Sequence, residues 1–226
     1  MIICDDPAFL FVHVPKSAGT SISGAFAHLD LMRRAKRRHK DPDAQATWLE
    51  ARGYSARLLD LPIHASAVGV KEIIGEDKFN SLYSFAVVRN PWDMELSWYT
   101  YNTQVTSAPH FKILQQYTDF TDYVCRHLDA YGRLLASRPQ TKYVFDKTGQ
   151  QIVDKVLRYE SLADGFNEVV SCLGLTNILL DHFNQSYHEP WTDSYTPQTF
   201  ELVRNLSLVD CEAFDYAREA TDYGID

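Results

Sequence analysis

A lysine, three hydroxyl residues and two small residues follow the first strongly apolar segment of the chain. The segment at residues 8–14 is rich in Phe and Val, which indicates a strand buried on both faces. Apolar residues at helical spacing begin at Ile22. Between the apolar segment and this helix lie residues that allow a tight turn: Lys16, Ser17, Ala18, Gly19, Thr20 and Ser21. Backbone N–H groups at a helix start, together with hydroxyls and an ammonium, are donors that bind phosphate. The sequence therefore predicts an anion-binding turn here, with a purely structural turn as the alternative.

This turn differs from the phosphate loop of nucleotide hydrolases. That loop reads G-x-x-x-x-G-K-[ST], with the lysine after the second glycine and a hydroxyl on magnesium. Here Lys16 comes three positions before Gly19, and no glycine stands at the first glycine position. An ATP- or GTP-using phosphotransferase with a degenerate loop stays as an alternative, although a convincing magnesium-binding Asp is missing.

A second strand-to-helix segment carries an arginine. Residues 84–88 indicate another buried strand, Arg89 ends it, and Pro91 suits the first turn of a following helix. Ser97 would lie two turns into that helix. Arg offers a fork of donors that phosphate oxygens accept bidentately. Arg89 and Ser97 are therefore predicted to bind a second phosphate.

Together the two segments resemble the sulfotransferases that use 3′-phosphoadenosine-5′-phosphosulfate (PAPS), most of all the carbohydrate-type branch with its chondroitin and uronyl enzymes and bacterial relatives. In that family a Pro-Lys-[ST]-[AG]-[GS]-[ST]-[ST] loop binds the 5′-phosphosulfate, and Pro15–Ser21 matches it at every position. An Arg-[ND]-Pro-x-[DE]-Arg-x-x-Ser segment binds the 3′-phosphate, and it is matched by Arg89, Asn90, Pro91, Asp93 and Ser97. Met94 stands where an Arg is usual.

A third, weaker motif extends the resemblance over about residues 8–216. Arg158-Tyr-Glu-Ser-Leu162 followed by Phe166 is similar to a late family motif, R-[FY]-E-x-L-x-x-D-F. The resemblance implies PAPS as donor, 3′,5′-bisphosphoadenosine (PAP) as product and no required metal. It also implies these donor-binding residues: Pro15, Lys16, Ser17, Ala18, Gly19, Thr20, Ser21, Arg89, Ser97 and Arg158.

The expected fold is α/β. Strands alternate with helical patterns, which predicts a mainly parallel sheet with helices on both faces, and the resemblance implies a P-loop-like sulfotransferase fold. With 226 residues, one domain over 1–226 is expected. Helices are expected at 120–128, 161–173 and 197–220, two short strands around a turn within 143–158, and a substrate-side loop at 102–118.

Two catalytic roles follow from the chemistry of sulfuryl transfer, which needs positioning, charge neutralisation at the leaving oxygen and proton removal from the acceptor. Lys16 is predicted to meet the leaving phosphate oxygen. His64 is predicted to be the base, because His suits proton removal near neutral pH and related enzymes place a His in this interval. A loop hydrogen bond is the alternative for His64. His13 is the competitor, expected instead to be a core histidine with a satisfied hydrogen bond, and Glu72 is a weaker candidate.

Composition limits the classes of binding partner and the compartment that can be expected. A net charge of −8 argues against general nucleic-acid binding, although residues 33–40 hold six of the 22 Lys and Arg, either as a solvated segment or as a rim for an anionic acceptor or donor. Neither a secretory signal nor a membrane span is recognisable, so a cytoplasmic, bacterial protein is expected. The four cysteines lack metal or redox spacing and are expected to be reduced and mostly buried.

The acceptor is open at this stage. The resemblance favours a carbohydrate or glycoconjugate, while a lipid or small-metabolite hydroxyl is compatible with the same residues. Aromatic residues available for stacking on a sugar, each with core packing as the alternative, are Trp48, Trp98, Tyr99, Tyr101 and Trp191. A catalytically inactive binding protein with the same fold is a further alternative. The oligomeric state is not predicted.

Overall fold

Four strands form one sheet, in the order β1 (Ile2–Asp5), β2 (Ala8–Val12), β3 (Tyr83–Val88) and β4 (Lys155–Arg158). The computed structural model describes residues 1–134, 139–180 and 190–225. Strand β1 pairs antiparallel with β2, whereas β2, β3 and β4 run parallel, with Val12 opposite Ala86 and Val88 opposite Arg158. The fold is therefore α/β with a mostly parallel sheet, as predicted, and the carboxyl ends of three strands lie at one edge.

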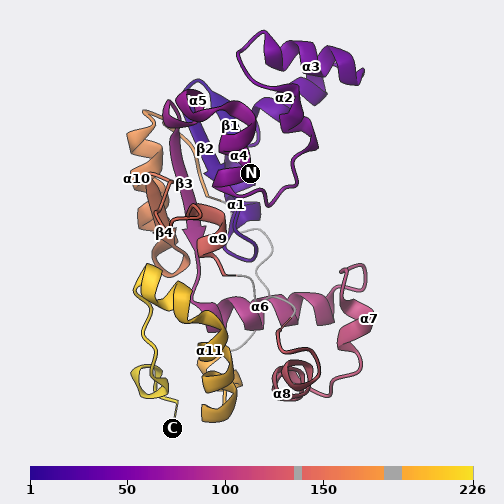
Figure 1. Ribbon diagram of the computed structural model, residues 1–226, viewed down its shortest axis with the longest axis vertical. Helices are drawn as coiled ribbons and strands as arrows, with labels where there is room; N and C mark the ends of the chain where they lie inside the picture. The colour runs from indigo at the N-terminus through magenta and orange to yellow at the C-terminus, as the bar shows by residue number, and fades with distance from the viewer. Residues whose placement is uncertain (135–138, 181–189, 226) are drawn as a thin grey trace. The chain divides into compact units, whose positions relative to one another are not determined.

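The chain divides into two units, which are described separately. The sheet unit comprises residues 1–88 and 140–184, and the helical unit residues 89–139 and 185–226. One domain over 1–226 stays a prediction. Besides the strands, the sheet unit contains α1 (Gly19–Ala25), α2 (Leu31–Arg38), α3 (Pro42–Glu50), η1 (Ala56–Asp60), α4 (Ala67–Ile74), α5 (Glu76–Asn80), α9 (Thr141–Val144), η2 (Tyr159–Ser161) and α10 (Leu162–Cys172) (Figure 1).

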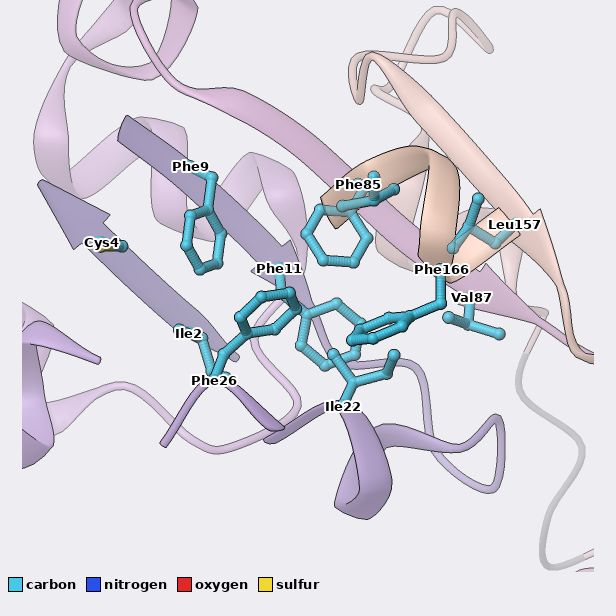
Figure 2. Packing of buried hydrophobic residues seen from close by; sticks show 11 residues of the cluster. Ile2, Cys4, Phe9, Phe11, Ile22, Phe26, Phe85, Val87, Leu157 and Phe166 are labelled. Atoms are coloured by element: carbon cyan, nitrogen blue, oxygen red, sulfur yellow. The ribbon is translucent and has the colours of Figure 1, made fainter. Parts of the chain in front are cut away.

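Aromatic side chains fill the core on one face of the sheet (Figure 2). Phe26, which directly follows α1, lies 5.0 Å from Phe9 and 5.4 Å from Phe166 of α10, measured between ring centroids. Residues that point to the opposite face, such as Leu10 and Val88, are also fully buried. Helices α4 and α9 are drawn in front of the strands in Figure 1. Burial on both faces explains why β2 and β3 are continuous apolar runs.

The helical unit is built around α6 (Pro91–Gln104), with α7 (Phe111–Leu114), α8 (Phe120–Tyr131), η3 (Trp191–Ser194), α11 (Pro197–Phe214) and η4 (Ala220–Tyr223). Trp92 of α6 stacks on Phe200 of α11 with ring centroids 4.2 Å apart, and its indole N–H donates to the Phe200 carbonyl. Trp191 stacks on Trp92 and Tyr123 on Tyr99. These aromatic side chains hold helices together within the unit.

Several local expectations were wrong. Residues 141–144 form α9, and only the Phe145–Gln151 bridge and β4 remain of the two strands expected within 143–158. The expected loop at 102–118 contains the end of α6 and all of α7, and its Leu114 is buried. Helix α11 ends at Phe214 because Asp215 adopts a left-handed conformation. All four cysteines are free, but Cys172 is exposed.

None of the helices in the described part of the chain is long and apolar enough to cross a membrane.

Candidate active site

The turn after β2 has an unusual backbone. Lys16 and Ala18 both adopt positive φ, 61° and 57°, and Ala18 is the residue that caps the start of α1. A left-handed conformation costs a non-glycine residue roughly 1–2 kcal/mol. Alternation of right- and left-handed residues turns successive N–H groups toward one concave side, an arrangement that binds anions. The backbone of this turn is therefore suited to phosphate.

Ser17 connects the turn to a distant segment of the sheet unit. Its side chain is buried, and its Oγ lies 3.3 Å from the Pro15 carbonyl oxygen and 3.4 Å from Oε1 of Gln140, both acceptors. Gln140 is fully buried directly before α9. Sequence reasoning missed Gln140, because it lies 123 residues from Ser17 and belongs to no motif. Ser17 is thereby held inward, while Thr20 is exposed and Ser21 buried.

Gly19 is required by the packing of His13. A Cβ atom at position 19 would lie 1.6 Å from Nε2 of His13, a severe overlap with the imidazole ring. No side chain larger than hydrogen fits while His13 holds this place. The close approach explains why the first residue of α1 is a glycine, although its φ is not positive.

His13 is buried but lacks the satisfied hydrogen bonding expected of it. Its Nδ1 has no hydrogen-bond partner among the described residues. Burial lowers the pKa of His13 to about 3, since the charged ring would lose its hydration. His13 is therefore neutral at physiological pH.

The carbonyl of His13 fixes the tautomer of His64. Nδ1 of His64 lies 2.9 Å from the His13 carbonyl oxygen, and because a carbonyl only accepts, Nδ1 must carry the proton. In the neutral ring Nε2 then has the lone pair. Burial lowers the pKa of the half-buried His64, which favours this neutral form. The two rings meet edge to face with centroids 4.4 Å apart.

Within the sheet unit, the turn and His64 both contact His13. His13 touches Gly19 with its ring and binds His64 through its carbonyl. Arg158 ends β4 and is exposed. Glu72, the weaker candidate base, is exposed on α4.

In the helical unit, an acidic residue of α6 holds Arg89. Arg89 follows β3 directly and is 6% exposed, and its Nε donates to Oδ2 of Asp93 at 2.6 Å. Asn90 begins α6, because its Oδ1 accepts from the N–H groups of Trp92 and Asp93 and Pro91 occupies the first turn. The ion pair with Asp93 fixes the orientation of the Arg89 guanidinium.

Ser97 and Met94 are also buried in α6. Ser97 lies two turns after Arg89 along the chain, as the motif requires. Met94 is 7% exposed and so contributes apolar packing to the helical unit at the position where an Arg is usual.

A comparison with models of known families matches residues 1–217 to the sulfotransferase family. Neither a curated protein nor a solved structure matches the chain. The family match covers nearly the whole chain, including the turn, His64, Arg89 and Arg158. The chain therefore belongs to the sulfotransferase family, the enzymes that transfer a sulfuryl group from PAPS.

Proposed function

We propose that the chain transfers the sulfuryl group of PAPS to a hydroxyl of a carbohydrate or glycoconjugate, as a member of the carbohydrate-type branch. The observation that carries the proposal is the hydrogen bond from His64 Nδ1 to the His13 carbonyl, beside the turn that contains Lys16. It leaves His64 Nε2 as a basic nitrogen in the same unit as a phosphate-binding backbone. The carbohydrate-type motifs support this branch and this class of acceptor.

The residues of the turn are proposed to bind the 5′-phosphosulfate. Lys16 and Ala18 have the positive φ values that a concave set of N–H groups requires, and Gly19 lets the backbone pack against the His13 ring. Thr20 and Ser21 add hydroxyl donors, while Pro15 and Ser17 hold the loop. Hydroxyl and backbone N–H donors without a carboxylate among them are the groups that bind phosphate.

Arg89, Ser97 and Arg158 are proposed to bind the remaining charge of the donor, with the 3′-phosphate assigned to Arg89 and Ser97. Asp93 orients the guanidinium of Arg89 through the 2.6 Å contact to Nε. Guanidinium groups bind phosphate bidentately, so a fixed orientation improves geometric selectivity.

In the proposed reaction, an acceptor oxygen attacks the sulfur in line with the bond to the 5′-phosphate. The new O–S bond forms as the bond from sulfur to the phosphate oxygen breaks, and PAP leaves. His64 Nε2 takes the acceptor proton. The ammonium of Lys16 meets the negative charge that develops on the leaving oxygen, and such stabilisation is larger in the transition state than in the ground state. No step needs a metal ion.

Two measurements test the function. A thermal-shift panel with PAP, AMP and ATP, each with magnesium and with EDTA, should show PAP raising the melting temperature equally in both, because a ligand that binds the folded state stabilises it. Incubation with PAPS and a panel of glycans, lipids and small hydroxyl compounds, read by mass spectrometry, identifies the product that gains a sulfuryl group. Stabilisation only by ATP with magnesium, or sulfation of lipids alone, would contradict the proposal.

A further inference from the structure

The helix α2 carries its cations on one side. Its buried residues are Leu31 and Ala35. At about 100° per residue, Arg33, Lys36 and Arg37 point to the opposite side of the helix. All three are exposed. We call these three residues the α2 basic face.

Most of the charge on this face is not neutralised within the fold. Arg34, which lies outside the face, pairs with Asp5 at 2.7 Å. Arg33 lies 3.6 Å from Asp30, but its side chain is 54% exposed, so the pair is weak. Lys36 and Arg37 have no ion-pair partner in the part of the chain that the structure describes. The α2 basic face is therefore open to an anion from outside.

Helix stability does not account for this clustering. Arg33 is three residues from Lys36 and four from Arg37, and like charges at these spacings each destabilise a helix by roughly 0.2–0.5 kcal/mol. The helix dipole favours cations in the last turn, which includes Lys36 and Arg37, but not Arg33 near the start. Neither effect favours a cation at position 33.

The α2 basic face lies away from the phosphate-binding turn. Arg34 pairs with Asp5, which stands opposite Ala8 at the amino end of β2. The turn leaves the carboxyl end of β2, and the strand alone spans about 13 Å at about 3.3 Å per residue. Figure 1 shows α2 and α3 beyond the sheet edge that is opposite to the turn. The helix therefore does not form a rim around the proposed donor-binding turn.

We propose that the α2 basic face is an exosite for a polyanionic glycan, a chain bearing repeated sulfate or carboxylate groups. This inference rests on the proposed function, because a carbohydrate sulfotransferase acts on, or produces, anionic glycans. Guanidinium groups bind sulfate and carboxylate oxygens bidentately. A site separate from the turn lets one part of a long chain be held while another part reacts, which raises the local concentration of acceptor.

Charge and burial favour a glycan over a membrane or a double-stranded nucleic acid. Outside residues 33–40 the chain has 16 Lys and Arg and 30 Asp and Glu, which gives that part a net charge of −14. A broad anionic surface is therefore repelled by the rest of the protein, whereas one narrow chain can bind along a single helix. An amphipathic helix binds membranes by inserting apolar side chains. Leu31 and Ala35 are buried against the protein and do not serve that purpose.

The test measures binding of a fluorescein-labelled heparin oligosaccharide by anisotropy at several salt concentrations. The variant R33Q/K36Q/R37Q removes the face. The control K112Q/K142Q/K147Q removes the same charge from three exposed lysines elsewhere. We expect the first variant to weaken binding by roughly tenfold and to flatten its salt dependence, since each exposed pair contributes up to about 1 kcal/mol. The control should bind nearly as the wild type does.

Equal weakening in the two variants would overturn the exosite. Tighter binding of single-stranded DNA or phosphatidylserine vesicles than of heparin, lost with the same three residues, would overturn the assignment to a glycan. PAP-induced thermal stabilisation, unchanged in both variants, verifies that the fold is intact. Heparin binding needs no turnover, so the two proposals can fail separately. A transfer assay that finds no carbohydrate product would overturn the proposed acceptor. The anisotropy measurement alone would still decide whether the exosite exists.

Discussion

Lys16 lies in the turn after β2, where its backbone adopts a positive φ of 61°. If it stabilises charge on the leaving oxygen, Lys16→Ala should lower turnover by at least about a hundredfold, while PAP binding weakens much less. Single-turnover transfer of labelled sulfate measures the first quantity, and calorimetry with PAP the second. Normal turnover in the variant would rule out this role.

His64 is expected to act as the base in its neutral form. His64→Ala should lower turnover by roughly 10²–10⁴-fold and leave PAP binding nearly unchanged. Since burial lowers the pKa of His64, the wild-type rate should stay high at neutral pH and fall only below the usual histidine range, as Nε2 becomes protonated. The pH–rate profile of the variant should lack that acid limb.

A matched control separates the catalytic role of His64 from a general effect of replacing a histidine. The exposed His28 offers a matched substitution, His28→Ala, which should retain both the rate and the limb. If His64→Ala keeps most of its activity with saturating acceptor, His64 is not the base, and Glu72 and His13 should be tested next.

Arg89 and Ser97 are expected to decide the selectivity for a 3′-phosphate. Ser97→Ala and Arg89→Ala should weaken PAP binding but barely change AMP binding, and loss of Arg89 should cost roughly 2–5 kcal/mol because the 3′-phosphate then lacks its paired cation. Calorimetric titration with both nucleotides gives the two affinities. Equal losses for PAP and AMP would mean that Arg89 has a structural role.

At the scale of the element, the β2–turn–α1 segment depends on one close approach. Gly19→Ala should displace His13, since the added Cβ would lie 1.6 Å from Nε2, and so disturb both the turn and the hydrogen bond to His64. We expect a lower melting temperature, weaker PAP binding and reduced turnover. A second substitution, His13→Ala, should recover part of the lost stability, because it removes the clashing ring.

The comparison of single and double variants makes this prediction specific. Gly69→Ala on α4 is a suitable control, because a Cβ there would be 3.5 Å from its nearest neighbour, an ordinary contact. If Gly19→Ala is as stable as Gly69→Ala, or if adding His13→Ala recovers no stability, the close packing of Gly19 and His13 does not determine the stability of the β2–turn–α1 segment.

At the scale of the whole molecule, His13 makes the free energy of unfolding depend on pH. Its pKa is about 3 in the folded state and near 6.5 when unfolded, so protons bind the unfolded chain more tightly. Stability should therefore fall as the pH drops below about 6.5. At about 1.4 kcal/mol per pH unit, this residue alone should remove about 2 kcal/mol between pH 7 and pH 5.

Urea denaturation of the wild type and His13→Gln at both pH values measures this effect. Glutamine does not titrate, so the variant should lose about 2 kcal/mol less than the wild type over the same interval. An identical loss in the two proteins would show that His13 does not govern acid stability.

The sequence by itself predicted the features that adjacent residues determine. The apolar run, the turn of small residues and the start of α6 at Pro91 depend on local spacing, on glycine at position 19 and on proline geometry. The α/β class followed from the alternation of such segments. The family motifs are short and contiguous, so the resemblance to sulfotransferases needed no tertiary structure.

Only the tertiary structure decided which distant groups meet. Ser17 contacts Gln140, 123 residues away, and His64 donates to the His13 carbonyl, 51 residues away. Tyr143 and Val144, which favour strands, belong to α9 and are buried there. Arg34 pairs with Asp5 and so holds α2 at the amino end of β2. Local propensities for helix or strand differ by less than about 1 kcal/mol per residue. Packing and buried hydrogen bonds between distant segments outweigh these differences. No local sequence pattern shows which distant segments will meet.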